Sequence, residues 1–568
     1  MLILNRKTNQ PSIKPLKIMR AKLTLCAAAA CLLAIQGCKK NELSKNDQVQ
    51  VTRLRATALT GTYNTYTIAN AGSAKHIEVG GVVNQGTKQN NSTLLQQWAA
   101  SATTPDRWQK WNVVDLGTGY YKIVNLFSGK VLDVPGSSTT QGQVLQQYDW
   151  NGSNAQQWQI TVVSGVNYKI INRGNGLAIT NEGGSTSNGT AITQRTFVNN
   201  NTQYWQFNLF ARDSFRDNEL TNFFKRTSGS VAFDGVFSVP MTYGANNGKV
   251  MWPTNDAWYN GLNGAGNAAC LGGNFPIAYR STNLVQSAAV SGVWNFTPGS
   301  TSNITSTSNG TQFFPILSGT SWTWPSGGVE VGSHVYVYAD EGNGLSQTSA
   351  GIYDINLGSL PTYTVTRLNT PAMSGQTAIR YMHGMVKVTD AGVNYVYIYG
   401  AGGGFGAGDV YVARFLQSSP TTWTFWNGSS WAASPTTAAG AAILTGLPWG
   451  GFWVEKVNGK YVIASMDFGF GCDIAQRDVY TRFSTDPKSG WSANKKVYSL
   501  PDYKQGHAPV YYAPAIHPQF SSNSEMVFTY CINFYDSCLT PCSNSDGTMD
   551  PNDYRAKAVR IPYALIGI

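Results

Sequence analysis

Two aspartates occupy surroundings in which a carboxylate is costly. Asp234 lies in the strand-like run SVAFDGVFSVPM (residues 230–241), and Asp256 follows 22 residues later among the aromatic residues of MWPTNDAWY (251–259). Asp forms strands poorly, and burying its charge costs free energy. Hydrolysis of a glycosidic bond requires two carboxyl groups, one protonated as the acid and one ionised as the base or nucleophile. The two residues therefore predict acid–base chemistry, if the fold turns both toward one pocket.

Five further titratable residues follow in later strand-like segments and are supporting candidates: Asp340 and Glu341 in YADEG, His383 in YMHGM, Asp467 in SMDFG and His517 in AIHPQF. A turn or a hydrogen-bonding role explains each of them equally well. The sequence does not decide which aspartate is the acid, because burial sets the pKa values. The GxSxG and HExxH motifs are absent and no ligand cluster is evident. We therefore expect no metal and no other cofactor, and we leave a central structural cation open.

The composition predicts the elements that must position these residues. At 568 residues the chain is long enough for two or three domains. Charged residues make up only 12%, whereas Gly (59), Tyr (29) and Trp (17) are abundant. This mixture is typical of short strands joined by tight turns. The sequence therefore predicts an all-β fold.

An internal repeat marks the first domain. The motifs QKW, QQW and QYW end at Trp111, Trp158 and Trp205, with a spacing of 47 residues each time. Related phrases precede them: YTIANAGSAKHIEV, YKIVNLFSGKVLDV and YKIINRGNGLAIT. Residues 60–210 thus resemble the ricin B-type β-trefoil, in which three copies of a four-strand unit close a barrel around the three Trp residues.

This resemblance implies sugar-binding residues in two of the three repeats. An acid, a Gln, an aromatic residue and the Gln of QxW correspond to Asp133, Gln146, Tyr148 and Gln156 in the second repeat, and to Glu78, Gln96, Trp98 and Gln109 in the first. The first repeat departs from the family in having Glu78 where the family has Asp. The third repeat has Ala178, Thr193 and Arg195 at these places, and we expect it to bind nothing. The alternative is that the repeats serve the barrel core alone.

The remainder of the chain predicts a linker helix and a propeller. Residues 211–227 form the one convincing helical stretch, in which Phe215, Leu220, Phe223 and Phe224 can share a face. From residue 228 to residue 568, strands such as HVYVYADEG, DVYVARF and EMVFTYCIN recur with no helices between them, as in a five-bladed β-propeller. The glycine-rich GAGGGFGAG leads into a strand, so we interpret it as a hairpin tip and not as a phosphate-binding loop.

Several phrases of this region resemble an endo-D-arabinanase-type glycoside hydrolase family that was formerly a domain of unknown function. They are FDGVFSVPM with GKVMWPTNDAWY, YVYIYG with VYVARF, FSTDPKSGW, and YYAPAIHPQFSSNSEMVFTYCIN. The resemblance implies that Asp234 and Asp256 are the catalytic pair, on adjacent inner strands of the first blade. In that family the second acid follows Phe-Gly. Here it follows Thr254 and Asn255, so its immediate surroundings differ from those in the family.

The N-terminus predicts export. Residues 19–38, MRAKLTLCAAAACLLAIQGC, resemble a bacterial lipoprotein signal, with cleavage before Cys38 and lipid on its thiol. Met19 is a plausible true start, residues 39–59 form a polar tether, and an uncleaved anchor is the alternative. Residues 1–55 hold eleven Lys and Arg against Glu42 and Asp47, which is nine of the net charge of +11, so a nucleic-acid partner is not expected. We expect a protein exported and lipid-anchored at the bacterial outer membrane or cell surface.

The five cysteines beyond the signal are Cys270, Cys472, Cys531, Cys538 and Cys542. In an oxidising compartment they favour disulfides over metal ligands, and an odd number leaves at least one unpaired.

Two functions from different classes fit these observations. One is a surface glycoside hydrolase acting on a polysaccharide, for example a D-arabinan or arabinogalactan, with the trefoil holding the glycan. The other is a glycan-capture lipoprotein in which both domains only bind. The sequence favours the enzyme, because two acids in matching blade positions are costly without chemistry.

Overall fold

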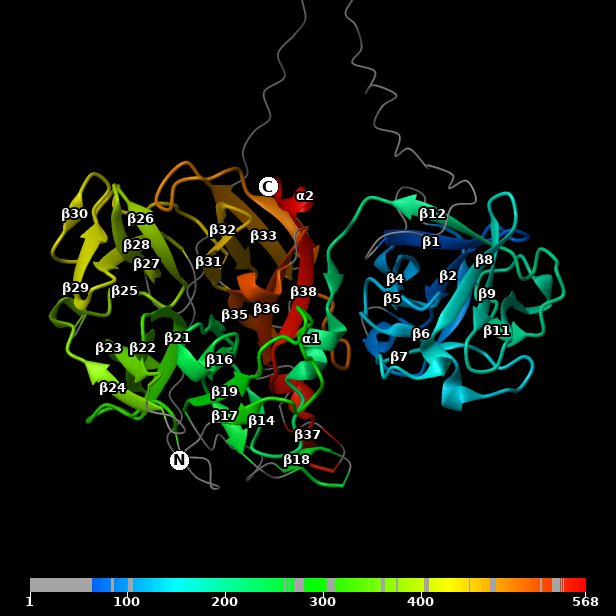
Figure 1. Ribbon diagram of the computed structural model, residues 1–568, viewed down its shortest axis with the longest axis horizontal. Helices are drawn as coiled ribbons and strands as arrows, with labels where there is room; N and C mark the ends of the chain where they lie inside the picture. Colours follow the sequence, from blue (N-terminus) through cyan, green and yellow to red (C-terminus); the bar gives the residue numbers. More distant parts are fainter. Residues whose placement is uncertain are drawn as a thin grey trace, which may run out of the picture. The chain divides into compact units, whose positions relative to one another are not determined.

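The computed structural model describes residues 64–82, 86–100, 106–259, 262–264, 266–269, 280–303, 312–358, 363–373, 376–402, 408–448, 450–469, 477–521, 524–533, 542, 544 and 546–568. The predicted signal, Cys38 and the tether lie outside these residues. The fold is all-β, with a trefoil and a five-bladed propeller (Figure 1). In the described part of the chain, no helix has the length and apolar character needed to cross a membrane.

The trefoil consists of twelve strands joined in one sheet system, coloured blue to cyan-green in Figure 1. They are β1 (Asn64–Asn70), β2 (His76–Val79), β3 (Thr93–Trp98), β4 (Trp111–Asp115), β5 (Tyr121–Asn125), β6 (Val131–Asp133), β7 (Gln146–Tyr148), β8 (Trp158–Ser164), β9 (Asn167–Asn172), β10 (Ala178–Asn181), β11 (Ile192–Arg195) and β12 (Trp205–Phe210). Closure is visible in the pairing of β1 with β12 and β4.

The three repeat tryptophans form the centre of this barrel. Trp111, Trp158 and Trp205 are fully buried in one apolar cluster. Each indole Nε1 donates to a backbone carbonyl at the equivalent place in its own repeat, over 3.0–3.1 Å: Ile77, Leu132 and Ile179 respectively. The threefold sequence repeat is therefore a threefold repeat of burial and hydrogen bonding, because a buried indole N–H needs an acceptor.

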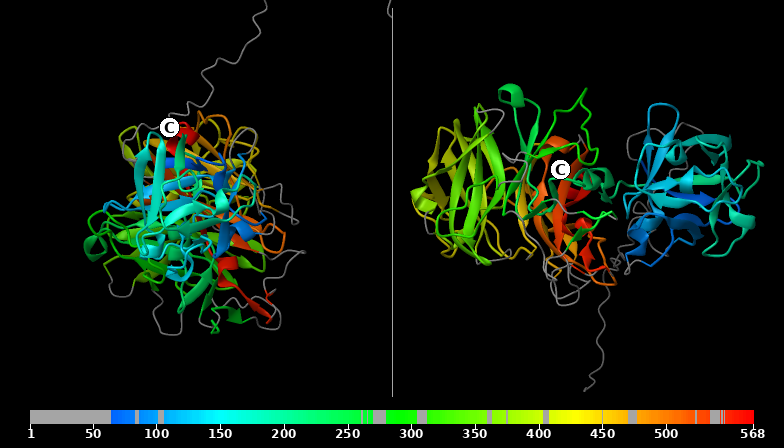
Figure 2. Two further views of the ribbon diagram at one scale, coloured as in Figure 1. Left: turned by 90° about the vertical axis from the view of Figure 1, so that its right-hand side faces the viewer. Right: turned by 90° about the horizontal axis from the view of Figure 1, so that it is seen from below.

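The propeller has five antiparallel sheets around a common centre (Figure 1), and Figure 2 shows them from two other sides. Blade 1 is β15 (Val239–Pro240), β16 (Val250–Thr254), β19 (Thr282–Gln286) and β20 (Ser302–Asn303). Blade 2 is β21 (Trp322–Val331), β22 (His334–Asn343), β23 (Ser346–Asn356) and β24 (Thr364–Leu368). Blade 3 is β25 (Ile379–Arg380), β26 (Met385–Asp390), β27 (Val393–Gly402), β28 (Val410–Leu416), β29 (Ser419–Trp426) and β30 (Trp431–Ala432).

Blade 4 is β31 (Phe452–Val457), β32 (Lys460–Met466), β33 (Asp478–Ser484) and β34 (Lys495–Ser499). Blade 5 is β35 (Val510–Ile516), β36 (Glu525–Asn533), β38 (Lys557–Pro562) and β13 (Phe215–Arg216). Two short ladders lie beside the blades: β14 (Ser230–Phe233) with β17 (Ala257–Tyr259), and β18 (Ala268–Ala269) with β37 (Thr548–Met549). The short helix α2 (Tyr563–Ile566) follows β38.

The N-terminal segment of the propeller closes the ring, which corrects the predicted linker helix. Only α1 (Asn218–Phe223) is helical, with the carboxylate of Asp217 accepting from the Leu220 N–H as its cap. Phe215 lies instead in β13, which pairs with β38 as the outermost strand of the last blade. Strand pairing across the chain ends outweighs the local helical pattern, because it ties the first segment to the last blade.

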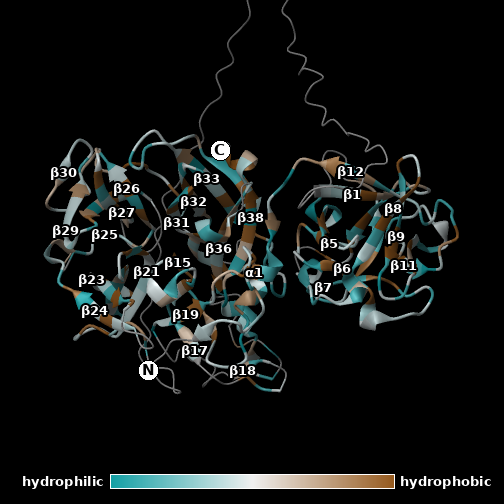
Figure 3. Ribbon diagram, in the orientation of Figure 1, coloured by the Kyte–Doolittle hydropathy of each residue, from teal (hydrophilic) through white to brown (hydrophobic). Residues whose placement is uncertain are grey.

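Five apolar clusters, one between each pair of neighbouring blades, hold the ring together. Alternation along β27 shows how: Val396 and Ile398 belong to the cluster shared with blade 2, whereas Tyr397 and Tyr399 belong to the cluster shared with blade 4. Side chains alternate between the two faces of a strand, so each middle strand supplies two interfaces. In Figure 3 the hydrophobic residues gather along the strands.

The structure tests two smaller predictions, one on the glycine-rich segment and one on the cysteines. β27 and β28 pair antiparallel up to Ala401 and Val410, so the glycine-rich segment does connect a hairpin, although its residues 403–407 lie outside those described. Cys542 is disulfide-bonded, whereas Cys531 is a free and buried thiol. Cys270, Cys472 and Cys538 lie outside the described residues.

Candidate active site

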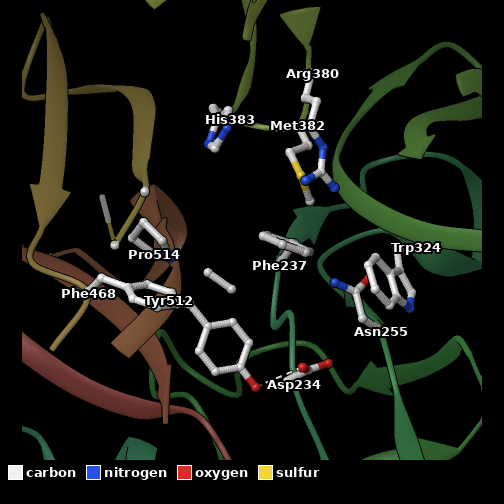
Figure 4. A pocket seen from close by; sticks show the side chains of 13 residues that line it. Asp234, Phe237, Asn255, Trp324, Arg380, Met382, His383, Phe468, Tyr512 and Pro514 are labelled. Atoms are coloured by element: carbon white, nitrogen blue, oxygen red, sulfur yellow. Dashed lines mark hydrogen bonds between the residues drawn. The ribbon is translucent and has the colours of Figure 1, made fainter. Parts of the chain in front are cut away.

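All five blades contribute residues to one cavity at the centre of the propeller (Figure 4). The cavity has mainly apolar walls, with four polar side chains set into them. The lining residues are Asp234, Phe237 and Asn255 near blade 1, Trp324 from blade 2, Arg380, Met382 and His383 from blade 3, Gly450, Gly451 and Phe468 from blade 4, and Tyr512, Ala513 and Pro514 from blade 5. Aromatic walls with a few placed polar groups are typical of ligand sites.

Asp234 lies at the end of β14, where the chain turns from the small ladder into blade 1. Its N–H donates to the Asp256 carbonyl (3.2 Å), and its own carbonyl accepts from the Asn255 N–H (2.8 Å). The next residue, Gly235, has a φ of +60°, and a Cβ there would lie 2.3 Å from the Asn255 side-chain nitrogen. Only glycine fits this turn. The turn therefore places the lining residues Asp234 and Asn255 next to each other.

The two oxygens of the Asp234 carboxyl differ sharply. Oδ2 accepts from the hydroxyls of Tyr512 (2.8 Å) and Tyr554 (2.9 Å), whereas Oδ1 is buried and has no hydrogen-bond partner. Burial, followed by the nearby charge of Asp256, raises the pKa of Asp234 to about 7, although the tyrosine hydrogen bonds oppose this shift. The carboxyl therefore retains a proton at a pH where an ordinary Asp is ionised, and Oδ1 is the oxygen available to carry it.

Asp256 has a different setting and is not part of the lining. Trp324 Nε1 donates to its Oδ1 (2.9 Å), and Arg280 pairs with its Oδ2 (3.2 Å). Burial raises the pKa of Asp256 to about 6, against the effect of these two donors. A backbone hydrogen bond thus joins the two predicted acids. Asp234 has one carboxyl oxygen without a partner, whereas each carboxyl oxygen of Asp256 has a donor. Asp234 follows β14, and Asp256 lies between β16 of blade 1 and β17, so neither lies within an inner strand of blade 1 as predicted.

Arg380 and His383 form a second polar region of the cavity. Arg380 pairs with the fully buried Asp340, with 2.7 Å from its Nε to Oδ2. His383 Nδ1 lies 2.9 Å from the carbonyl oxygen of Phe452, and its ring stacks on the Phe452 ring with centroids 4.2 Å apart. Burial, then the charge of Arg380, lowers the pKa of His383 to about 4, so the imidazole is neutral at pH 7.

Of the five supporting candidates, only His383 lines the cavity. Asp340 does not line the cavity, but it pairs with Arg380, which does. Glu341 points to the other side of the same strand, where it pairs with Arg367 (2.5 Å) and accepts from Tyr353 (2.7 Å). Asp467 accepts from the Asp478 N–H (2.7 Å) and shapes the end of β32, which corrects its predicted place in the site.

The predicted place of His517 in the site is also wrong, because this residue belongs to the core. Its Nδ1 lies 2.6 Å from the Ser238 hydroxyl and its Nε2 lies 2.7 Å from the Thr529 hydroxyl. The ring packs against Trp252, with centroids 5.2 Å apart, and burial lowers the pKa of His517 to about 3. A neutral imidazole with both nitrogens occupied has no capacity left for a ligand.

No sequence pattern pointed to Arg380, Trp324 or the tyrosine pair that binds Asp234. Tyr512 reaches the cavity because β35 contains a bulge between Tyr512 and Ala515, with Ala513 at a φ of +49°. Bulges turn side chains toward functional sites, and the YYAP sequence alone does not reveal one. Among the described residues, His, Cys, Asp and Glu form no group of three that could hold a metal ion.

The trefoil assembles its first two predicted sugar sites. In the second repeat, Gln146 donates to Asp133 (2.6 Å), and Gln156 donates to the Asp149 carbonyl (2.9 Å). The side chain of Tyr148 is exposed beside them. Burial raises the pKa of Asp133.

The first repeat repeats this arrangement around Glu78, which accepts from Gln96 and Gln109 at 2.8 Å each, with Trp98 exposed. Here Lys88 lies 3.7 Å from the Glu78 carboxylate, a cation that the second repeat lacks at Asp133. In the third repeat, Arg195 pairs with Glu182 (2.5 Å), so the side chain at the aromatic place is tied to its own domain.

Comparison with known proteins assigns the propeller to a family. The family model described as Domain of unknown function (DUF5005) matches residues 217–562, more than half of the chain. The chain belongs to the DUF5005 family. A second model, Ricin-type beta-trefoil lectin domain-like, matches residues 107–195 and 154–230 of this DUF5005 protein. The resemblance of the DUF5005 domain to the endo-D-arabinanase-type family stays a prediction. A comparison with curated proteins finds no match.

Solved structures give three similar chains. A protein named as a putative hydrolase from Bacteroides ovatus is 17% identical, with 61% of this chain and 90% of that chain covered and a TM-score of 0.48. The exo-beta-1,3-galactanase 1,3Gal43A from Clostridium thermocellum is 34% identical over 26% of this chain and 30% of its own, with a TM-score of 0.24. The Macrolepiota procera ricin B-like lectin, solved with lactose, is 18% identical over 26% and 97%, with a TM-score of 0.22.

The turn at Gly235 gives a first test. Gly235→Ala should destabilise the DUF5005 domain by several kcal/mol, because the left-handed backbone costs about 1–2 kcal/mol and the Cβ displaces Asn255 as well. Gly244→Ala is the matched control, since Gly244 has a φ of +56° and open space around it. Thermal unfolding of the two variants measures the difference. Equal melting temperatures would show that the contact with Asn255 does not constrain the turn.

The buried carboxyl gives a second test, by pH. Because folding raises the pKa of Asp234 above its ordinary value of 3.8, its stabilising contribution is complete below about pH 4 and is lost as the pH rises through 7. The free energy of unfolding of the parent should fall across this window by up to about 4 kcal/mol relative to Asp234→Asn. Denaturant unfolding between pH 4 and pH 8 measures this.

Asp390→Asn serves as the control for that experiment. A hydrogen bond from Tyr397, followed by the ion pair with Arg414, lowers the pKa of Asp390, so removing this carboxyl should leave the fall between pH 4 and pH 7 in place. Parallel pH profiles for the parent and Asp234→Asn would contradict a raised pKa at Asp234.

Proposed function

We propose that this DUF5005 protein is a glycoside hydrolase that acts on a polysaccharide, with the trefoil retaining the glycan. One observation carries the proposal: a buried carboxyl with a raised pKa and a bare oxygen lies in an aromatic-lined cavity to which all five blades contribute. Burial of a carboxyl in an apolar site is how a general acid keeps its proton near neutral pH.

The geometry divides the two carboxyls between the two roles of this reaction. Asp234 Oδ1 would donate its proton to the glycosidic oxygen, because Oδ2 is occupied by two tyrosine hydroxyls. Asp256 would be the ionised partner, because Arg280 and Trp324 stabilise its charge. The aromatic walls, Phe237 and Trp324 among them, would cover the apolar C–H faces of a sugar ring.

A second function is glycan capture without hydrolysis. The position of Asp256 favours it, because this carboxylate is hydrogen-bonded behind Trp324 and does not line the cavity. In this alternative, Asp234 and Asn255 would only bind hydroxyl groups. The glycan in either case is proposed to be a polysaccharide such as a D-arabinan or an arabinogalactan. Export and lipid attachment at Cys38 belong to the proposal as well.

The test of catalysis is the turnover of an arabinan by the parent and by Asp234→Asn and Asp256→Asn. Either change should lower the rate at least ~100-fold, because it removes the proton donor or the ionised partner while keeping the side chain's size. Thermal unfolding accompanies each assay, since a purely structural role predicts activity that falls only with the folded fraction. Full turnover by Asp234→Asn with an unchanged melting temperature would remove Asp234 from the mechanism.

The trefoil has its own test. Asp133→Ala should abolish most retention on an insoluble polysaccharide, because Asp133 is the acceptor that Gln146 positions for sugar hydroxyls. Ala178→Asp in the third repeat should restore little, since Arg195 and Glu182 remain paired there. A pull-down assay that measures the protein left in solution over the insoluble polysaccharide tests both variants. Unchanged retention by Asp133→Ala would move the site away from the second repeat.

A further inference from the structure

The cavity has a second polar region that the proposed reaction does not use. Figure 4 shows Arg380 and His383 on the side of the cavity away from Asp234. Arg380 ends the short strand β25, and His383 lies in the segment that leads from β25 to β26 of the same blade. Backbone bonds from His383 N–H to the Tyr399 carbonyl (3.1 Å) and from Val454 N–H to the His383 carbonyl (2.9 Å) fix this segment between blades 3 and 4.

The charge of Arg380 is cancelled inside the protein. Asp340 has no exposed surface, and its Oδ2 accepts from Nε (2.7 Å) and pairs with a terminal nitrogen (2.6 Å) of Arg380. Its Oδ1 accepts from the Tyr338 hydroxyl (2.8 Å) and the Gln347 amide (2.9 Å). Four donors thus surround this one buried carboxylate. The guanidinium thus lines the cavity without bringing net charge to it.

His383 brings the complementary acceptor. The Phe452 carbonyl oxygen can only accept, so Nδ1 carries the ring proton and Nε2 is the unprotonated nitrogen. Stacking on Phe452 fixes the orientation of the ring. The lowered pKa of His383 agrees with an uncharged imidazole at neutral pH. A donor and a neutral acceptor three residues apart suit hydroxyl groups, which both donate and accept.

We propose that Arg380 and His383 bind hydroxyl groups of an uncharged sugar residue, and that the Asp340–Arg380 pair makes the cavity reject acidic sugars. This proposal rests on the proposed function for the identity of the ligand as a glycan. A sugar carboxylate would meet no uncompensated cation in this lining and would share the cavity with Asp234, so its desolvation would not be repaid. Asp340 is therefore a positioning residue that also sets specificity.

The experiment uses matched pairs of polymers: an arabinan and an arabinogalactan, each beside a sample whose primary alcohols have been oxidised to carboxylates. Calorimetric titration is done with the full chain carrying Glu78→Ala and Asp133→Ala, so that the trefoil contributes little binding. The neutral polymer should bind at least ~10-fold more tightly than its oxidised form. Arg380→Gln should weaken binding of the neutral polymer roughly 10- to 100-fold.

Asp340→Asn tests the positioning role. It leaves the guanidinium without its counter-charge, so the preference for the neutral polymer should shrink at least ~10-fold, a change that simple loss of folded protein does not produce. Asp390→Asn is the matched control. Asp390 pairs with Arg414 within blade 3, and neither residue lines the cavity. If Asp340→Asn does not fold, the result for Arg380→Gln still decides.

The outcomes separate this proposal from the proposed function. Binding of the neutral polymer that depends on Arg380, without cleavage, supports this subsite and rejects the hydrolase. Cleavage combined with equal or tighter binding of the oxidised polymer overturns this subsite and leaves the hydrolase standing. Binding of neither form, or binding indifferent to Arg380→Gln, also overturns it.

Discussion

The DUF5005 domain depends on the closure of its ring. Five apolar interfaces hold the blades, and the fifth forms only when the chain's last strands meet its first ones. β13 ensures this by pairing with β38. α1 adds Leu220 and Phe223, and the residue after it adds Phe224, to the cluster between blades 5 and 1. Without this closure the inner strands would have no common axis, and the cavity residues of different blades would not converge.

Closure also explains how an acid can be kept protonated at the centre. Tyr512 and Tyr554 come from the end of the chain and Asp234 from the beginning of the domain, more than 270 residues apart in sequence. The raised pKa of Asp234 is an unfavourable term, because the folded protein withholds water from a group that prefers to ionise. In a ring with packed interfaces between its blades, the favourable burial there offsets this cost at the axis. Removing one blade would expose the Asp234 carboxyl to water.

The trefoil also depends on closure, here of a barrel with three repeats. Its core is repeated faithfully, since each buried indole needs a carbonyl in the same place. Its outer side chains are not repeated: Asp133 has no cation beside it, Glu78 has Lys88, and the third repeat carries the Arg195–Glu182 pair. Barrel closure constrains the core positions of all three repeats, whereas surface positions are free to diverge.

The sequence alone determined what repeats and what alternates. The 47-residue spacing of QxW identified the trefoil and its core, because a period is a local property of the chain, and the alternation of strands and turns identified the propeller. It also singled out Asp234, His383 and the residues around Asp133 and Glu78. Tertiary structure decided the rest. It placed Phe215 and Arg216 of the expected helix in β13, His517 in the core, and Asp256 behind Trp324. It also brought Arg380 and Tyr512 to the cavity. Burial, pairing and pKa depend on neighbours distant in the chain, which no local pattern records.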